Sequence, residues 1–392
     1  MKPRLTFVIN HAAFFVSHRL PIALHARERG YRISLVTGQA GSAGMELDAE
    51  RRLAAEGIDH RRVAFGASSM NPLVELSGLA QLIASLRWLR PDIVHCASPK
   101  GILYGGLAAR LTRVPALVLA VSGMGYAFTQ GSGRSLARRA ISTLYRRAAR
   151  IAFAHPNRRF IVQNRIDRQF LLDSRLAGDG DIELIAGSGV SLDDFAGMGP
   201  QAKQRLVLLP ARMLVDKGVR EIVEAARRIR ADAAGWRFVL AGAADYRSPS
   251  AIPPAEIRAW QAEGVVEWLG HVDDMLPLYR DAAIVCLPSY REGMPKVLLE
   301  AAAAGCATVT TDVPGCCEAI ADGVTGDLVP VRDSSALADT LLALIKDDDR
   351  RRRYGSAGRL MARQRFSIES VKDRTMEIYA ALLEKVRDRT GP

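Results

Sequence analysis

The stretch AIVCLPSYREGMPKVLLEAAAAGCATVTT, residues 283–311, contains the signals of a strand, a helix and a second strand in succession. AIVCLP (283–288) and ATVTT (307–311) are short apolar runs, which are typical of strands buried on both faces of a sheet. Between them, Pro295 suits the first helical position, and residues 297–304 are apolar and mostly alanine. Strand, helix and strand in this order predict a βαβ unit of a parallel sheet.

Similar apolar runs recur along the chain in two series. The first series comprises residues 5–9, 33–37, 92–96, 116–121, 159–163 and 182–186. The second series comprises residues 205–210, 237–242, 265–270, 283–288 and 307–311. Because 392 residues exceed one ordinary core, we predict an α/β protein with two Rossmann-like domains that face a cleft, each a parallel sheet with helices on both faces.

This reading sets the domain boundaries that we expect. An N-terminal domain spans residues 1–190, and a Gly-rich, polar linker spans 191–204. A C-terminal domain spans 205–366, and residues 367–392 carry a helix that packs back toward the N-terminal domain. In open parallel sheets, ligands bind beyond the carboxyl ends of the strands. Residues just after each strand are therefore the first candidates for a site.

Composition narrows the function classes. The formal net charge is +12, which favours anionic partners such as phosphorylated small molecules or anionic lipid. Only 6% of residues are aromatic and no nucleic-acid motif is present, so we expect no nucleic-acid partner. The five cysteines and seven histidines show no metal-binding spacing, which predicts reduced thiols, no metal site and a cytoplasmic protein. No apolar run reaches bilayer-spanning length.

Two glutamates flank the predicted start of the 297–304 helix. Glu292 lies in the loop after strand 283–288, and Glu300 lies in the second helical turn. The helix start offers free N–H groups near Gly293 and Met294, and the helix dipole favours a phosphate there. Gly293 and Glu300 are separated by roughly 10 Å along the axis, similar to the distance from a diphosphate to a flanking sugar. Carboxylates accept hydrogen bonds from sugar hydroxyls, so this arrangement predicts a nucleotide-sugar site.

The segment REGMPKVLLEAAAAGC (291–306) resembles the signature of glycosyltransferase family 4. ARMLVDKGV (211–219) resembles its diphosphate-binding segment, and GSGVSLDDF (187–195) resembles its interdomain hinge. FFVSHRLPIALHARERGYRISLVTG (14–38), SPKGILYGGLAARL (98–111) and VSGMGYAF (121–128) resemble a bacterial subgroup. That subgroup elongates polyprenyl-diphosphate-linked saccharides for surface polysaccharide, O-antigen or protein glycosylation.

The resemblance implies a retaining, metal-independent hexosyltransferase of the GT-B fold that needs no cofactor. Glu292 would contact the donor sugar and Glu300 the ribose, while Arg212 and Lys217 would stabilise the departing nucleoside diphosphate. Further donor-binding candidates lie nearby: Gly242, Gly293, Met294 and Pro295. We expect a UDP-linked hexose or N-acetylhexosamine as donor and a polyprenyl-diphosphate-linked saccharide as acceptor. Retention through a covalent intermediate and retention by same-face attack both stay open.

The N-terminal half departs from the family pattern. Ser122 stands where many members have a histidine, and the family's glycine-rich loop after the first strand is missing. Ser122 and Gly123 remain candidates to line the acceptor side through their backbone. His11 and His18 are candidate acceptor contacts or satisfied polar residues. Lys100, between a strand and a helix, is a candidate contact for an acceptor phosphate.

Residues 133–160 hold eight arginines and no acid, and their apolar residues recur at helical spacing. Such a segment predicts docking on the anionic inner face of the membrane, although an ordinary surface helix has the same pattern. A second function class also stays open, because nucleotide-sugar 2-epimerases likewise use two facing Rossmann-like domains. Donor supplied alone distinguishes the two, since only an epimerase converts it into another nucleotide-sugar.

Overall fold

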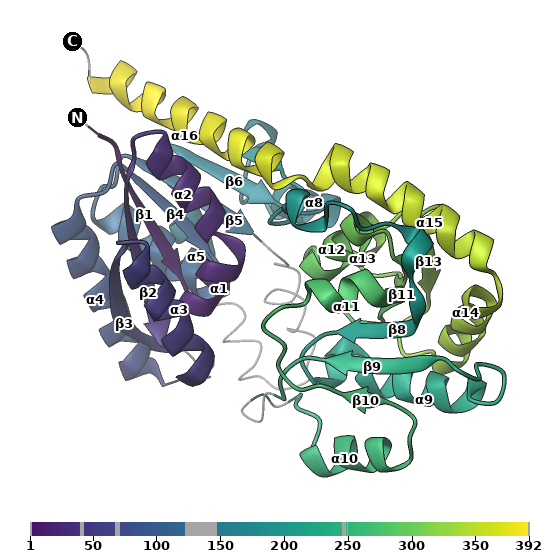
Figure 1. Cartoon of the computed structure of the whole chain (residues 1–392). Helices are drawn as coiled ribbons and strands as arrows, with labels where there is room; N and C mark the ends of the chain where they lie inside the picture. Colours follow the sequence, from purple (N-terminus) through teal and green to yellow (C-terminus); the bar gives the residue numbers. More distant parts are fainter. Residues whose placement is uncertain are drawn as a thin grey trace. The chain divides into compact units, whose positions relative to one another are not determined.

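The computed structural model describes residues 2–39, 43–66, 71–121, 147–244, 248 and 250–390. The chain divides into two compact units (Figure 1). Unit 1 comprises Met1–Ile185 together with Val371–Pro392, and unit 2 comprises Ala186–Ser370. Among the described residues, no helix combines the length and the apolar character needed to cross a bilayer.

Unit 1 is built on a parallel sheet of seven strands in the order β3-β2-β1-β4-β5-β6-β7. The strands are β1 (Arg4–Ile9), β2 (Arg32–Gln39), β3 (Asp59–Gly66), β4 (Ile93–Ala97), β5 (Ala116–Val121), β6 (Arg158–Val162) and β7 (Ile182–Leu184). The helices are α1 (Ala12–His18), α2 (Leu20–Glu28), α3 (Ala43–Ala55), α4 (Pro72–Leu89), α5 (Pro99–Leu111), a helix over 147–153, α8 (Arg165–Asp173) and the short η2 (Asp179–Asp181).

Unit 2 repeats this plan with six parallel strands in the order β10-β9-β8-β11-β12-β13. The strands are β8 (Gln204–Pro210), β9 (Arg237–Ala241), β10 (Glu267–Trp268), β11 (Ala282–Leu287), β12 (Ala307–Thr311) and β13 (Gly326–Val329). The helices are α9 (Val219–Ile229), α10 (Pro254–Ala262), α11 (Leu276–Asp281), α12 (Lys296–Ala304), α13 (Cys316–Ala319), α14 (Ser334–Lys346) and α15 (Asp348–Met361). Short 3₁₀ or π turns are η3 (Asp193–Phe195), η4 (Pro200–Ala202), η5 (Val215–Lys217) and η6 (Ala362–Phe366).

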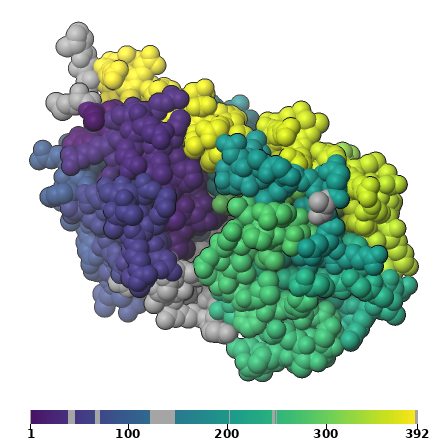
Figure 2. All heavy atoms as spheres, viewed as in Figure 1, coloured from purple at the N-terminus to yellow at the C-terminus, as the bar shows by residue number. Residues whose placement is uncertain are grey.

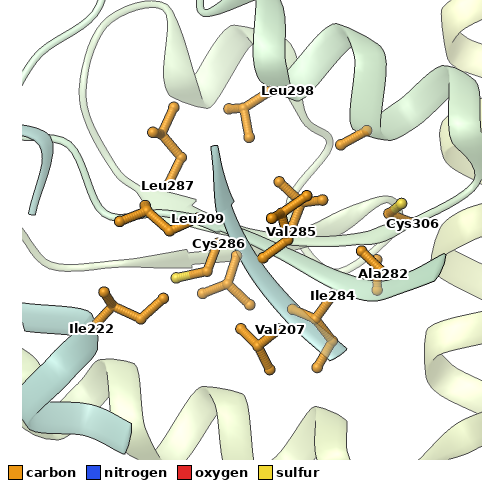
Figure 3. Packing of buried hydrophobic residues seen from close by; sticks show 14 of the residues in the cluster. Val207, Leu209, Ile222, Ala282, Ile284, Val285, Cys286, Leu287, Leu298 and Cys306 are labelled. Carbon is orange, nitrogen blue, oxygen red and sulfur yellow. The ribbon is translucent and has the colours of Figure 1, made fainter. Parts of the chain in front are cut away.

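The core of unit 2 explains why residues 283–311 form a βαβ unit. Ile284, Val285 and Cys286 of β11 are completely buried, as is Leu298 of α12. Figure 3 shows these side chains interdigitating with residues of β8 and with Ile222 of α9. A strand buried on both faces has no polar face to alternate with, so its sequence is a continuous apolar run.

The last helix, α16 (Ile368–Thr390), belongs to unit 1 from residue 371 onward. The Tyr379 hydroxyl lies 2.6 Å from Nδ1 of the buried His95 in β4, and the Asn157 side chain donates to the Leu382 carbonyl at 3.0 Å. In Figure 2 the yellow C-terminal helix rests directly on the purple N-terminal elements of this unit. Burial lowers the pKa of His95 well below its ordinary value and raises that of Tyr379, so both side chains are neutral.

The predicted fold class of two parallel α/β sheets is confirmed, with local differences. The run 265–270 contributes only a two-residue strand, β10. The sequence reading missed β3 and β13, which are edge strands with polar residues in their sequences. Residues 191–204, expected to form a linker, are part of unit 2, because Phe195 and Met198 are buried in its core.

Candidate active site

Glu292 lies in the loop that joins β11 to α12, where a second loop reaches it. Lys217, in η5 just after β8, forms an ion pair with Oε1 of Glu292 through its Nζ atom. Ser289 Oγ donates a hydrogen bond to the same Oε1 at 2.7 Å. The Lys217 and Glu292 side chains are 21% and 13% exposed, so water weakens this pair less than it would a surface pair.

Both donors act on one carboxylate oxygen, and this fixes the orientation of the group. No described residue donates a hydrogen bond to Oε2 of Glu292. An ionised carboxylate offers about four acceptor positions, so Oε2 retains its capacity to accept from hydroxyl groups. The arrangement therefore suits a ligand that presents O–H donors, as a sugar does.

Close backbone packing holds the two loops together. Gly218 adopts a φ of +71°, and a Cβ atom at this position would lie 2.1 Å from the Pro288 carbonyl oxygen. The Tyr290 amide donates to the Asp216 carbonyl at 2.9 Å, which joins the loop after β11 to the loop after β8. Glycine at 218 is therefore required both by conformation and by space, and it lets Lys217 approach Glu292.

Glu300 has partners of its own on the inner side of α12. Its Oε2 accepts from the Tyr279 hydroxyl at 2.9 Å, and its Oε1 lies 3.3 Å from Lys296 Nζ. Burial, and secondly the Glu300 charge, raise the pKa of Tyr279 well above its ordinary value, so the hydroxyl stays a donor. Pro295 is the N-cap rather than the first residue of the helix, which begins at Lys296.

The other predicted donor residues surround this loop pair. Arg212 is exposed in the loop after β8, and Gly242 follows β9, where a Cβ would meet the Ala211 carbonyl oxygen at 1.9 Å. The Gly293 carbonyl lies against Gly315, and Met294 is 8% exposed. The strand order β9-β8-β11 thus brings Gly242, Arg212, Lys217 and Glu292 to one edge of the sheet.

The predicted acceptor-side residues lie in unit 1 and make local contacts there. His11 caps α1, because its Nδ1 accepts from the Phe14 amide at 3.2 Å, and His18 stacks on Phe14 with ring centroids 4.4 Å apart. Lys100 Nζ lies 2.8 Å from Glu75 Oε1. Ser122, Gly123 and residues 133–146 of the basic segment lie outside the described residues.

The structure also adds residues that the sequence reading did not select. Ser289 and Tyr279 orient the two glutamates, yet they come from different elements. In unit 1, Ser98 has a φ of +68°, and its Oγ accepts from the Asn10 amide at 2.9 Å. Ser289 and Ser98 each follow a buried strand, and that position is the only sequence signal that marks them. The described residues contain no group of three or more His, Cys, Asp or Glu that could hold a metal ion.

Comparison with known proteins identifies two family models along the chain. Residues 4–155 match the model described as "Glycosyl transferase 4-like", and residues 204–347 match "Glycosyl transferases group 1".

Individual relatives extend this likeness over most of the length. The chain is 28% identical to the Campylobacter jejuni N,N'-diacetylbacillosaminyl-diphospho-undecaprenol alpha-1,3-N-acetylgalactosaminyltransferase, over 87% of this chain and 89% of that protein. It is 22% identical to the Staphylococcus aureus capsular polysaccharide biosynthesis glycosyltransferase CapM, over 79% and 82% of the two chains. The crystal structure of Anabaena Alr3699/HepE in complex with UDP-glucose covers 96% of this chain and 99% of its own, with a TM-score of 0.73 at 17% identity.

Proposed function

We propose a function for this chain on the premise that it belongs to the group 1 glycosyltransferases of family 4 and has the GT-B fold. It transfers a hexose or N-acetylhexosamine from a UDP-sugar to a polyprenyl-diphosphate-linked saccharide, and the transferred sugar retains its configuration. The observation that carries the proposal is the Glu292 carboxylate, held on one oxygen by Lys217 and Ser289 at the carboxyl edge of the second sheet. The solved relative with UDP-glucose supports a UDP-linked donor, and the C. jejuni relative supports a lipid-linked acceptor.

In this proposal the two glutamates bind the two sugars of the donor. Oε2 of Glu292 accepts from hydroxyls of the transferred sugar, while Lys217 and Ser289 hold Oε1 in place. Glu300, oriented by Tyr279 and Lys296, accepts from the ribose hydroxyls. The diphosphate lies between them, near the start of α12, where the helix dipole favours negative charge.

The leaving group is stabilised by fixed cations. As the glycosidic bond breaks, negative charge grows on the nucleoside diphosphate, and Arg212 and Lys217 lie in the loop that follows β8. Groups that are already in position when charge develops contribute most to the transition state. Because Lys217 also contacts Glu292, it links the sugar-binding carboxylate to the departing phosphate.

The proposed acceptor determines where in the cell the enzyme works. A polyprenyl-diphosphate saccharide stays in the membrane, so we place the enzyme at its inner, cytoplasmic face, where nucleotide-sugars are present. The positive charge of the chain favours that anionic surface. The pathway is then assembly of surface polysaccharide, O-antigen or a protein glycan, in keeping with the capsular relative.

The test is a transfer assay with purified protein. UDP-sugars are supplied one at a time with lipid-linked saccharides extracted from membranes, and products are analysed by mass. A mass gain of one hexose or N-acetylhexosamine on the lipid-linked saccharide, lost in Glu292→Gln, supports the proposal. Donor converted to a different nucleotide-sugar without any acceptor would instead identify an isomerase, and no product from any donor would contradict the transferase assignment.

A further inference from the structure

Helix α4 presents a continuous apolar stripe to solvent. Leu73 is 76% exposed, and Leu76 and Trp88 are each 64% exposed. Ala80 and Ala84, also exposed, complete a series with spacings of three and four residues, which lie on one face of a helix. The 18 residues of α4 span about 27 Å, so the stripe runs the full length of an outer element of unit 1 (Figure 1).

This stripe is not the face that α4 uses to join its unit. Gly78, Leu82 and Leu86 are buried on the opposite side, against β3 and its neighbours. The polar side chains form a separate line, in which Gln81 accepts from the Ala64 amide at 3.0 Å and donates to Ser77 Oγ at 3.1 Å. Gln81 thus bonds to β3 and to Ser77, and the large apolar side chains of Leu73 and Leu76 face water without any such partner face. An exposed apolar face of this kind marks a binding site for another molecule.

Charges at the end of the stripe indicate which occupant. The Arg61 guanidinium lies 3.6 Å from the Trp88 ring centroid, and Arg87 and Arg90 are exposed beside it. The only acid in α4, Glu75, is turned inward, where it accepts from Lys100 at 2.8 Å and from the Tyr104 hydroxyl at 2.6 Å. An apolar stripe bordered by arginines, with a tryptophan at one end, matches the interface of an anionic bilayer.

We propose that the exposed stripe of α4 is a membrane-docking surface that lies in the interface of an anionic lipid bilayer. A second copy of the chain fits less well, because its α4 has no outward acid to pair with these arginines: the only acid of the helix, Glu75, is turned inward. The surface shares no residue with the basic segment 133–160. The proposed lipid-linked acceptor explains why the enzyme would bind a membrane, and to that extent the inference rests on the proposed function. Binding of the stripe to lipid itself needs neither donor nor acceptor.

The test is flotation of the full-length chain with vesicles of phosphatidylcholine alone or mixed with phosphatidylglycerol. The double variant Leu73→Glu/Leu76→Glu should lower the partition coefficient onto the mixed vesicles by at least about tenfold, because two large apolar side chains are lost from the interface. Leu360→Glu is the matched control, since Leu360 is 57% exposed on α15 of unit 2. Parent-like binding by the double variant would overturn the proposal.

A second measurement locates the helix directly. Trp88 is the single tryptophan outside unit 2, so the difference between the parent and Trp88→Phe isolates its fluorescence. We expect brominated lipid to quench the Trp88 fluorescence of bound protein. Bound protein whose Trp88 fluorescence is not quenched would overturn the proposal. A third outcome is that the parent does not bind vesicles but forms concentration-dependent dimers, which Leu73→Glu/Leu76→Glu abolishes. That result would assign the stripe to a second copy of the chain instead. Glu292→Gln should bind vesicles like the parent, so failure of the proposed reaction and failure of this surface are distinguishable.

Discussion

Ser289 donates a hydrogen bond to Glu292 at 2.7 Å, on the same carboxylate oxygen that Lys217 contacts. Because Ser289 is completely buried, its own position is fixed by the strand end that carries it. In the proposed function, the serine therefore orients the carboxylate and does not itself bind the donor.

Ser289→Ala should lower kcat about fivefold to tenfold with a smaller change in KM. One hydrogen bond contributes about 1 kcal/mol, and here it fixes a group whose orientation matters most in the transition state. Steady-state kinetics with varied donor separate the two constants. Ser356→Ala, an exposed serine of α15, serves as control, and a parent-like kcat for Ser289→Ala would rule out the positioning role.

Lys217→Ala should lower kcat by about a hundredfold to a thousandfold, the range for removing a fixed group that stabilises developing charge. The variant also leaves the Glu292 carboxylate without its cation. The control is Lys346→Ala, whose partner Asp232 lies at 3.3 Å on an exposed surface. Turnover of Lys217→Ala close to the parent rate would show that Lys217 plays no part in departure of the diphosphate.

Glu300→Gln should raise the donor KM about tenfold while kcat stays near the parent value. In the proposed function Glu300 binds the ribose, whose contacts are equal in the ground and transition states, so their loss should affect binding alone. Tyr279→Phe should shift KM in the same direction, because it removes the hydroxyl that orients Glu300. Tyr354→Phe removes a comparable buried contact, to Asp327 at 2.8 Å, and should leave KM unchanged. A larger effect of either Tyr279→Phe or Glu300→Gln on kcat than on KM would argue against ribose binding.

Gly218→Ala should destabilise unit 2 by about 2–4 kcal/mol. The new methyl group would clash with the Pro288 carbonyl, in addition to the conformational cost of a positive φ. Gly323→Ala isolates the second contribution, because Gly323 has a φ of +68° and open space around it, and it should cost only about 1 kcal/mol. Urea unfolding of both variants measures the difference, and equal costs would contradict the steric argument.

Stability should fall at acidic pH partly through His95. Its pKa in the folded protein lies well below the ordinary value because burial disfavours the charged ring, so the unfolded chain binds this proton more readily. The contribution is complete above about pH 7 and falls by up to about 1.4 kcal/mol per pH unit below about pH 6.5. The pKa values of His60 and His155 are also lowered, and they add to the slope. Urea midpoints between pH 7.5 and 5.5 should therefore change less steeply in His95→Gln, and identical slopes would disprove the assignment.

The sequence predicted the fold where apolar runs were continuous and failed where they were not. β11 and β12 are buried strands with apolar or β-branched sequences, so their boundaries were placed to within a residue. β3 was missed because His60, Arg61 and Arg62 occupy an edge strand, where one side of the ladder is exposed to solvent. Periodicity detects burial, and it is weak wherever a strand is only partly buried.

The candidate site divides in the same way. Glu292 and Glu300 belong to one local segment, whose pattern a sequence can display. Ser289 and Lys296, which also contact them, belong to the same segment, but two further contacts join residues far apart: 75 positions between Lys217 and Glu292 and 21 between Tyr279 and Glu300. Such pairings follow from the strand order β8-β11 and from the packing of α11 on α12, which no local pattern encodes.

Because residues 371–392 complete the unit that the first 185 residues begin, the order of synthesis matters. All of unit 2 leaves the ribosome before Tyr379 can meet His95. The surface of unit 1 that contacts α16 therefore stays uncovered until translation ends. A premature stop between residues 371 and 379 would therefore spare unit 2 and leave the half of the molecule that is made first without its contact from Tyr379.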